Sequence, residues 1–207
     1  MIGDRLLITN KSVYNAKQIV NNLKDEKIIL IYGGSGTQKS ETADCLQEIL
    51  FRKNKQSIVL SLDDFYHTLP SLRNLNRKKL GIDSVGTGEI DWEELKRICD
   101  DFTNKKPIRF NRVHKYADLV EHITLDTEDV DYLIIEGLFS GYLKKDNYGD
   151  IAIYLEGNPK DTLEFRKKRA KENENDNFRK QIVQREYNIV YQLQRYADLI
   201  LTFEEKK

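Results

Sequence analysis

The segment that most constrains this chain is an apolar run that leads into a glycine-rich loop. Residues 28–31 (IILI) are followed, after one residue, by residues 33–40 (GGSGTQKS). A short apolar run that ends in glycines is typical of a buried parallel strand, and residues 39–50 have helical spacing. A strand, a glycine loop and a helix in this order predict a loop that binds the phosphates of a nucleotide. The alternative is a glycine-rich turn that merely links a strand to a helix.

This prediction gives the loop residues specific roles. Backbone N–H groups of the loop and the N-terminus of the following helix would bind phosphate oxygens. Lys39 would reach the β- and γ-phosphates, and the Ser40 hydroxyl would bind Mg²⁺. The predicted nucleotide-binding residues are Gly33, Gly34, Ser35, Gly36, Thr37, Gln38, Lys39, Ser40 and Glu41.

One position departs from the general pattern G-x-x-x-x-G-K-[ST] of such loops. Gln38 occupies the place of the second glycine, directly before Lys39. If this position requires a positive φ, glutamine costs about 1 kcal/mol of backbone strain relative to glycine. A loop weakened at Gln38 would suit a protein that binds a nucleotide without turning it over.

Composition limits the class of protein. The 207 residues suffice for one α/β core with a small lid, and we expect one domain over residues 1–207. Lys and Arg number 34, as do Asp and Glu, so no overall charge attracts nucleic acid. Without a long apolar run or a signal peptide, we expect a cytoplasmic protein with no membrane partner. Cys45 and Cys99, the two cysteines, fall at apolar positions of predicted helices and are expected to be buried.

Strands and helices alternate along the predicted structure. Buried strands are expected at residues 28–31, 57–62, 132–135, 151–155 and 199–203, and short strands near 108–110 and 122–125. Helices are expected at residues 12–24 with Ser12 as cap, from 39 to 50, at 91–102 with Asp91 as cap, and as a charged pair within 161–195 that breaks near 173–177. Residues 68–89 lack periodicity and are expected to form a long loop. The fold class is therefore α/β, a parallel sheet of about five strands with helices on both faces.

Acidic side chains follow two of the predicted strands. Asp63 and Asp64 come directly after residues 57–62, and Glu136 follows residues 132–135. Ligands bind at the carboxyl ends of the strands in such sheets, so these acids are expected near the phosphate loop. There one carboxylate could hold Mg²⁺ and another could accept a proton from an attacking hydroxyl. Helix capping and turn formation are the alternative roles for these acids.

The densest basic segment is Arg166-Lys167-Lys168-Arg169, with Lys171 beyond it. Arg166 and Arg169 are three residues apart, so a helix presents both on one face. They could clamp transferring phosphates. The alternative is a solvated helix face that pairs with nearby glutamates.

The motifs taken together resemble the uridine kinase and phosphoribulokinase family of P-loop kinases. The segments GGSGTQKS, SLDDFY, IIEGLF, a basic lid and RYADLIL follow one another over residues 28–203. The resemblance implies ATP and Mg²⁺ as cofactors and a helical lid at about residues 161–177. It implies that Asp63 is the base that contacts the acceptor hydroxyl, that Lys39, Arg166 and Arg169 are catalytic, and that Ser40, Asp63 and Glu136 bind the metal.

The segment that would recognise the acceptor is less similar to the family. Residues 107–114 (PIRFNRVH) keep a proline and His114, but Arg109 stands where an aromatic residue is usual. Residues 82–92 lack the D-x-P-D-A-F-D-like stretch of uridine kinases. By resemblance, the substrate-binding residues are Asp63, Tyr66, Arg109 and His114. A possible stacking surface comprises Trp92, Tyr66, Phe110 and Tyr116.

The expected partner is a small-molecule acceptor, with a uridine- or cytidine-like nucleoside as the first candidate. Pantothenate-, glycerate- and sugar-phosphate-like alcohols are alternatives. So is a nucleotide-binding sensor without kinase turnover. A homo-oligomer stays open.

Overall fold

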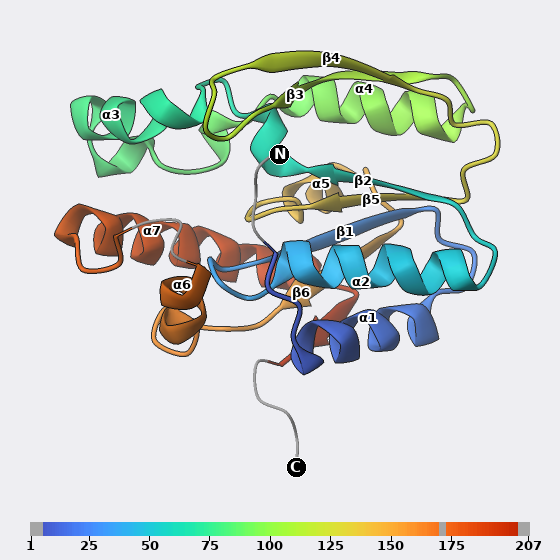
Figure 1. Cartoon of the computed structure of the whole chain (residues 1–207), viewed down its shortest axis with the longest axis horizontal. Coiled ribbons are helices and arrows are strands. Elements are labelled where there is room, and N and C mark those ends of the chain that lie inside the picture. Colours follow the sequence, from blue (N-terminus) through green and yellow to red (C-terminus); the bar gives the residue numbers. More distant parts are fainter. Residues whose placement is uncertain (1–5, 170–172, 203–207) are drawn as a thin grey trace.

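The computed structural model describes residues 6–169 and 173–202. Its centre is a parallel sheet of five strands in the order β2-β5-β1-β6-β7 (Figure 1). The strands are β1 (Ile28–Gly33), β2 (Ser57–Ser61), β5 (Tyr132–Glu136), β6 (Ile151–Leu155) and β7 (Leu199–Leu201). The predicted α/β fold is therefore confirmed. The last strand is shorter than expected, since β7 ends at Leu201 and Thr202 lies beyond it; Phe203 lies outside the described residues.

β1 is the middle strand, and its side chains alternate between two apolar layers. Ile28, Leu30 and Tyr32 pack into the layer that also holds parts of α4 (Trp92–Thr103) and α7 (Asn177–Leu193). Ile29 and Ile31 pack against α1 (Asn10–Asn22) and α2 (Lys39–Arg52) on the other face. All six residues of β1 are buried, as expected for a strand covered on both faces. The phosphate loop thus starts from a strand that is enclosed on both faces.

The predicted cap of the first helix is wrong. α1 begins at Asn10 with Thr9 as its N-cap, and Ser12 is the third residue of the helix. The Ser12 N–H donates to the Thr9 hydroxyl oxygen at 3.2 Å, and the Thr9 N–H donates to the Ser12 hydroxyl oxygen at 3.0 Å. This reciprocal pair satisfies two N–H groups that a helix start leaves open. The early start was missed because Asn10 and Lys11 are polar and carry no apolar periodicity.

The long loop predicted at residues 68–89 is also wrong in part. It contains a helix of 11 residues, α3 (Pro70–Leu80), with Pro70 in its first turn. Arg77 is the one residue of this helix that is buried, and Leu72, Leu75 and Leu80 are exposed. Because α3 presents no apolar stripe to the core, it has none of the periodicity by which a helix is recognised in sequence.

The two short strands predicted after residue 107 form an antiparallel hairpin of β3 (Ile108–Val113) and β4 (Val120–Leu125), separate from the main sheet. Phe110 of β3 stacks on Phe65 with ring centroids 5.9 Å apart. The predicted cap of α4 is confirmed, because the Asp91 carboxylate accepts the Glu94 N–H at 3.0 Å. The other α-helices in the described part of the chain are α5 (Tyr142–Lys145) and α6 (Leu163–Arg169).

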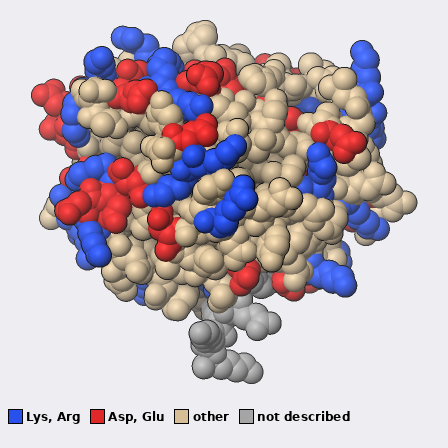
Figure 2. All heavy atoms as spheres, turned by 180° about the vertical axis from the view of Figure 1, so that it is seen from behind, with Lys and Arg blue, Asp and Glu red and all other residues tan. Residues whose placement is uncertain are grey.

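Cys45 and Cys99 are both buried, as predicted. Among the described helices, none is both long and apolar enough to cross a membrane. On the face shown in Figure 2, basic and acidic side chains are interspersed.

Candidate active site

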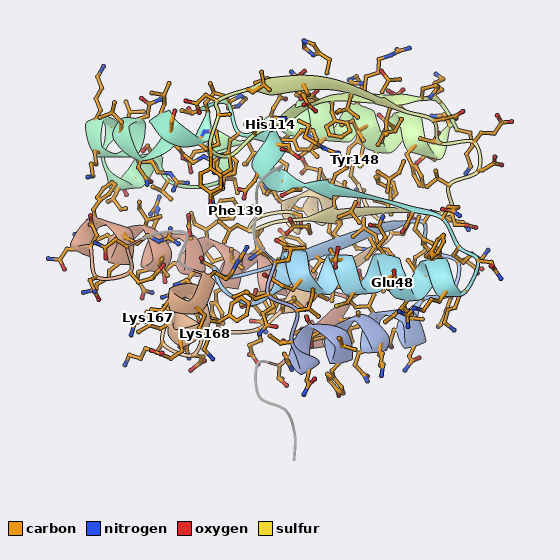
Figure 3. The ribbon with its side chains drawn as sticks, viewed as in Figure 1. Glu48, His114, Phe139, Tyr148, Lys167 and Lys168 are labelled. Carbon is orange, nitrogen blue, oxygen red and sulfur yellow. The ribbon has the colours of Figure 1, made fainter. Side chains whose placement is uncertain are left out.

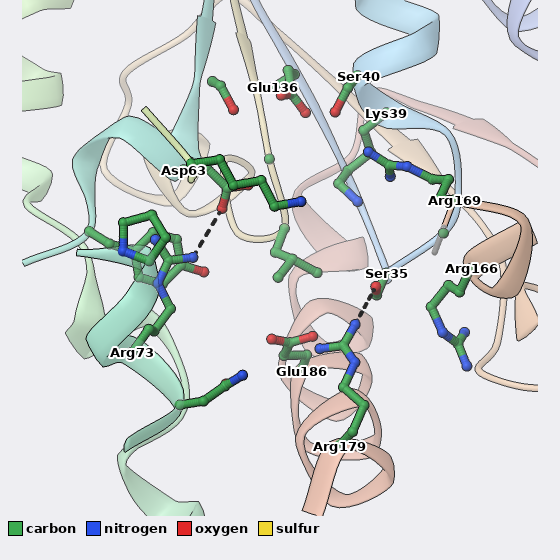
Figure 4. A pocket seen from close by; sticks show the side chains of 18 of the residues that line it. Ser35, Lys39, Ser40, Asp63, Arg73, Glu136, Arg166, Arg169, Arg179 and Glu186 are labelled. Atoms are coloured by element: carbon green, nitrogen blue, oxygen red, sulfur yellow. Dashed lines mark hydrogen bonds and ion pairs between the residues drawn. The ribbon is translucent and has the colours of Figure 1, made fainter. Parts of the chain in front are cut away.

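A cavity of about 370 Å³ lies at the carboxyl ends of β1, β2 and β5. Its lining brings together side chains from the phosphate loop, from the turn after β2, from the end of β5 and from α3, α6 and α7 (Figure 4). Of the residues predicted for the site, those that line the cavity are Ser35, Gly36, Lys39, Ser40, Asp63, Tyr66, Glu136, Arg166 and Arg169. The structure therefore collects strand-end groups that lie up to a hundred residues apart in the chain.

The glycine loop folds back on itself in front of α2. Both the Lys39 ammonium and the Thr37 hydroxyl donate hydrogen bonds to the carbonyl oxygen of Gly34, at 2.9 and 3.0 Å. Burial lowers the pKa of Lys39, and the charge of Glu136 opposes this shift. Gly36 has a φ of +85°, and a Cβ there would lie 2.7 Å from Cγ of Arg166. Glycine is therefore needed at this position both for the backbone angle and for the close approach of α6.

Gln38 has the left-handed backbone that the sequence pattern reserves for glycine, with φ 66° and ψ 35°. It is buried, and its side-chain oxygen accepts a hydrogen bond from the Thr9 hydroxyl. The next acidic residue, Glu41, is completely buried and lies 3.4 Å from the backbone nitrogen of Leu7. Contacts with Leu7 and Thr9, which precede α1, thus help to stabilise the loop at Gln38 and Glu41.

Two acidic groups face the cavity. Asp63, in the turn Leu62–Phe65, has a side chain that is 36% exposed, so it is accessible to a bound molecule. Glu136 ends β5 and is buried; this burial raises the pKa of its carboxyl, and the nearby Lys39 charge opposes the rise. Asp64 has another role, because its carboxylate accepts the Val113 N–H at 3.0 Å and so fixes the β3–β4 hairpin.

The donor set suits a hard divalent cation. Ser40, Asp63 and Glu136 supply hydroxyl and carboxylate oxygens to one cavity, and Mg²⁺ prefers one or two carboxylates together with phosphate oxygens. Among the described residues, no group of three or more His, Cys, Asp or Glu side chains could hold a metal alone. Water molecules and the phosphate oxygens of a nucleotide would complete the coordination of Mg²⁺ at this site.

The basic segment of α6 divides into two faces. Arg166 is buried and donates hydrogen bonds to Glu174 at 2.9 Å and to the Pro159 carbonyl at 3.1 Å. Arg169 Nε lies 3.4 Å from a carboxylate oxygen of Glu41, behind the phosphate loop. Lys167 and Lys168 are exposed and point away from the body of the protein (Figure 3). Lys171, the last residue of the predicted basic segment, lies outside the described residues.

Sequence reasoning missed a third arginine near the loop. Arg179 of α7 donates a hydrogen bond to the Ser35 hydroxyl at 3.3 Å and lines the cavity (Figure 4). The sequence shows only that Arg179 belongs to a charged helix after the lid. Because Ser35 lies 144 residues earlier in the chain, no local pattern links the two residues.

The structure does not bring two of the predicted substrate-binding residues to this cavity. Arg109 is exposed on β3, between the buried residues Ile108 and Phe110. His114 Nε2 lies 2.8 Å from Glu121 Oε1 in the hairpin, and His114 is not among the lining residues (Figure 3). Side chains alternate along a strand, so the burial of Phe110 turns Arg109 to the opposite face.

Instead, α3 supplies two arginines that sequence reasoning missed. Arg77 donates to Glu89 through Nε at 2.7 Å and Nη2 at 2.9 Å, and its Nη1 lies 3.6 Å from Glu186 of α7. Burial raises the pKa of Glu186, and the charges of Arg179 and Arg77 oppose this shift. Arg73 lies with Nη1 3.5 Å from Asp63 Oδ1 and with its guanidinium carbon 3.6 Å from the centre of the Tyr66 ring. These contacts depend on a helix that the sequence pattern does not reveal.

Comparison with known proteins identifies relatives over most of the chain. A family model described as the phosphoribulokinase / uridine kinase family matches residues 28–189. A uridine kinase from Ureaplasma parvum serovar 3 is 30% identical over 149 residues, which cover 70% of this chain and 69% of that protein. A bifunctional alpha-galactosidase/sucrose kinase from Mediterraneibacter gnavus is 27% identical over 162 residues, which cover 73% of this chain and 17% of that protein.

A solved structure has a similar fold. The phosphoribulokinase from Rhodobacter spheroides matches with a TM-score of 0.62 at 14% identity, covering 87% of this chain and 71% of that one.

Proposed function

The chain belongs to the phosphoribulokinase / uridine kinase family, and we propose that it is an ATP- and Mg²⁺-dependent kinase that phosphorylates a hydroxyl group of a small molecule. One observation carries the proposal. Lys39, Ser40, Asp63 and Glu136 come from three different strand ends and line one cavity. A nucleotide loop alone requires only the first two, whereas group transfer to an acceptor also requires a base that an acceptor can reach.

In this proposal Asp63 is the general base. It accepts the proton of the acceptor hydroxyl, whose oxygen forms a bond to the γ-phosphorus while the bond from that phosphorus to the β-phosphate oxygen breaks. ADP is the leaving group. The exposure of Asp63 to the cavity supports this role, because a base has to lie within hydrogen-bond reach of the proton it takes.

The cationic side chains stabilise the negative charge that spreads over the transferred group. Lys39, within the phosphate loop, contacts Gly34, and Arg179 of α7 contacts Ser35 of the loop. Arg169, on α6, also lines the cavity. Ser40, Asp63 and Glu136 would hold Mg²⁺, which when bound neutralises phosphate charge and orients the phosphate oxygens. Residues 161–177 would act as a lid that excludes water from the transfer.

The acceptor is a small molecule, as the family membership implies. A nucleoside is the first candidate from the sequence motifs, and the relative from Ureaplasma parvum is named a uridine kinase. A sugar or another small alcohol is the second, and the relative from Mediterraneibacter gnavus is named in part a sucrose kinase. We propose the cytoplasm as the location and no nucleic acid or membrane as partner.

A second function, nucleotide sensing without turnover, is favoured by one observation, the left-handed Gln38 in the phosphate loop. ADP release from Mg·ATP, measured with nucleosides, ribulose 5-phosphate, pantothenate and glycerate, separates the two. Acceptor-dependent ADP release that disappears in Asp63→Asn supports the kinase. Tight ATP binding without ADP release for any acceptor class supports the sensor, and failure to bind ATP contradicts both.

A further inference from the structure

The wall of the cavity across from the phosphate loop is built mainly by α3. This wall is where an acceptor would lie, because Asp63 separates it from Lys39 and Ser40 (Figure 4). Its side chains include Tyr66, Arg73, Arg77 and, from the turn after β3, Tyr116. Their chemistry bears on what kind of acceptor fits.

The wall offers little surface for stacking a nucleobase. Among the described residues, Tyr66 and Tyr116 are the aromatic side chains that line the cavity. One face of the Tyr66 ring is covered by the guanidinium of Arg73 at 3.6 Å, and Tyr116 is 78% exposed. Trp92 packs on Tyr142, and Phe110 packs on Phe65 in the core. The four aromatic residues that could have formed a stacking surface are therefore dispersed.

Arg73 is the distinctive group of this wall. Its Nη1 lies 3.5 Å from Asp63 Oδ1, a long contact, while its Nε and Nη2 are buried and make no hydrogen bond with any described residue. A buried donor without a partner is costly, and a charged one more so. Arg77 differs, because Glu89 and Glu186 engage its guanidinium. Arg73 thus has the donors that a bound oxyanion would satisfy.

The charge of the cavity favours the same conclusion. Seven Lys and Arg residues and four Asp and Glu residues line it, an excess of three positive charges, although the whole chain has a net charge of zero. The positive charge is therefore concentrated where substrates bind. A triphosphate bound at the loop would lie on one side of Asp63. Arg73, on the other side, would remain available to bind a second anion.

We propose that the acceptor carries an oxyanion, either a carboxylate or a phosphate, which Arg73 binds beside Asp63. This inference rests on the proposed function and narrows its acceptor to a small anionic alcohol. The hydroxyl and the oxyanion of the acceptor are only a few atoms apart, because Arg73 Nη1 and Asp63 Oδ1 are separated by 3.5 Å. A neutral nucleoside would leave the Arg73 donors unpaired.

Matched pairs of acceptors test the proposal. In each pair the neutral member has a hydroxyl group in place of the anion, and the other hydroxyl groups are shared: glycerate against glycerol, ribulose 5-phosphate against ribulose, and pantothenate against panthenol. The kcat/KM for ADP release from Mg·ATP is expected to favour the anionic member of the accepted pair by on the order of 100-fold. The first and second pairs separate a carboxylate acceptor from a phosphate acceptor.

Variants identify the residue responsible. Arg73→Gln is expected to raise KM for the anionic acceptor by on the order of 100-fold with a smaller effect on kcat. Arg73→Lys, which keeps the charge, is expected to recover part of that loss. Lys79→Gln removes a charge from the same helix at an exposed position and is expected to change neither constant.

A measurement of acceptor binding in the absence of turnover tests this inference separately from the proposed function. Calorimetry with protein loaded with Mg²⁺ and a non-hydrolysable ATP analogue is expected to detect the anionic member of one pair and to lose that binding in Arg73→Gln. Nucleoside turnover that is equal in wild type and Arg73→Gln overturns the inference and leaves the kinase intact. Anion binding at Arg73 without phosphate transfer in any pair contradicts the kinase and retains the anion site. Absence of anion binding in the loaded protein overturns the inference.

Discussion

The Thr9 hydroxyl donates a hydrogen bond to the side chain of Gln38 while it accepts the Ser12 N–H, so one side chain caps α1 and holds the phosphate loop. Gln38 has a φ of 66°, and this contact is available to glutamine but not to glycine. The departure from the usual loop pattern thus comes with a partner that glycine could not use.

Gln38→Gly is expected to leave stability and activity nearly unchanged. The change relieves about 1 kcal/mol of left-handed strain and loses a hydrogen bond worth about 1 kcal/mol. Gln38→Ala keeps the strain and loses the bond, so it should lower the free energy of unfolding by about 1 kcal/mol. Urea denaturation and ADP-release kinetics on both variants measure this. A large gain in activity for Gln38→Gly would show that the native loop is impaired.

Asp63→Asn is expected to lower kcat by at least about 100-fold, because an amide cannot take the acceptor proton. ATP affinity should change far less than kcat, because the phosphate loop binds the phosphates and Ser40 and Glu136 remain to hold Mg²⁺. Asp64→Asn is the matched control: its amide oxygen can still accept the Val113 N–H, so activity should persist. Rapid-quench kinetics and ATP-binding calorimetry check both, and an Asp63→Asn protein as active as wild type would remove the base from the mechanism.

Arg169→Ala is expected to lower kcat by about 100-fold, the scale on which the loss of one stabilising donor acts. Lys168→Ala provides the control, because Lys168 is on the same helix but exposed. Steady-state kinetics with a saturating acceptor distinguish the two. Equal effects from both variants would mean that α6 contributes general positive charge rather than a positioned arginine.

Glu136 predicts a pH dependence of stability. Burial raises its pKa, so the native protein binds this proton more tightly than the unfolded chain does. The contribution of Glu136 to the free energy of unfolding therefore falls as pH rises from about 4.3, the ordinary pKa of glutamate, through the raised pKa of the folded state. Glu136→Gln should remove this fall, whereas Glu48→Gln, at an exposed position, should not. Denaturation curves at a series of pH values measure it, and parallel pH profiles for all three proteins would contradict the assignment.

Arg77→Met is expected to lower the free energy of unfolding by about 3 kcal/mol or more, because it leaves the buried Glu186 without that partner. Arg97→Met is the comparison, since Arg97 pairs with Asp101 at 3.0 Å on the surface and such pairs contribute at most about 1 kcal/mol. Chemical denaturation of the two variants gives both values. A small loss for Arg77→Met would indicate that Glu186 becomes protonated instead.

The features predicted correctly from sequence are those with a local signal. The sheet strands are apolar runs, and the Asp91 cap precedes an amphipathic helix. α3 was missed because it packs through one buried arginine, Arg77, and not through an apolar face.

The site residues at the ends of strands could be predicted from the sequence. Those that reach the site through the position of a helix could not. Lys39, Asp63 and Glu136 follow apolar strands, and parallel strands bring their carboxyl ends to one edge. Arg73 and Arg179 reach the cavity only because of where α3 and α7 lie. Arg109 was expected at the site but does not reach it. Its segment was correctly predicted as a strand, but the sequence alone did not determine on which face of that strand the Arg109 side chain lies.

β5 lies between β2 and β1 in the sheet, although the chain reaches it after both. On the ribosome, the phosphate loop and Asp63 are therefore synthesised after two strands that are not neighbours in the finished sheet. Residues 34–131 emerge before the strand that joins β1 to β2, and the backbone N–H and C=O groups along both edges of β1 lack their strand partners throughout this time. We expect the nascent chain to depend on chaperones until both neighbours of β1, which end at residues 136 and 155, have left the exit tunnel. Fragments that end before β5 should aggregate instead of binding a nucleotide.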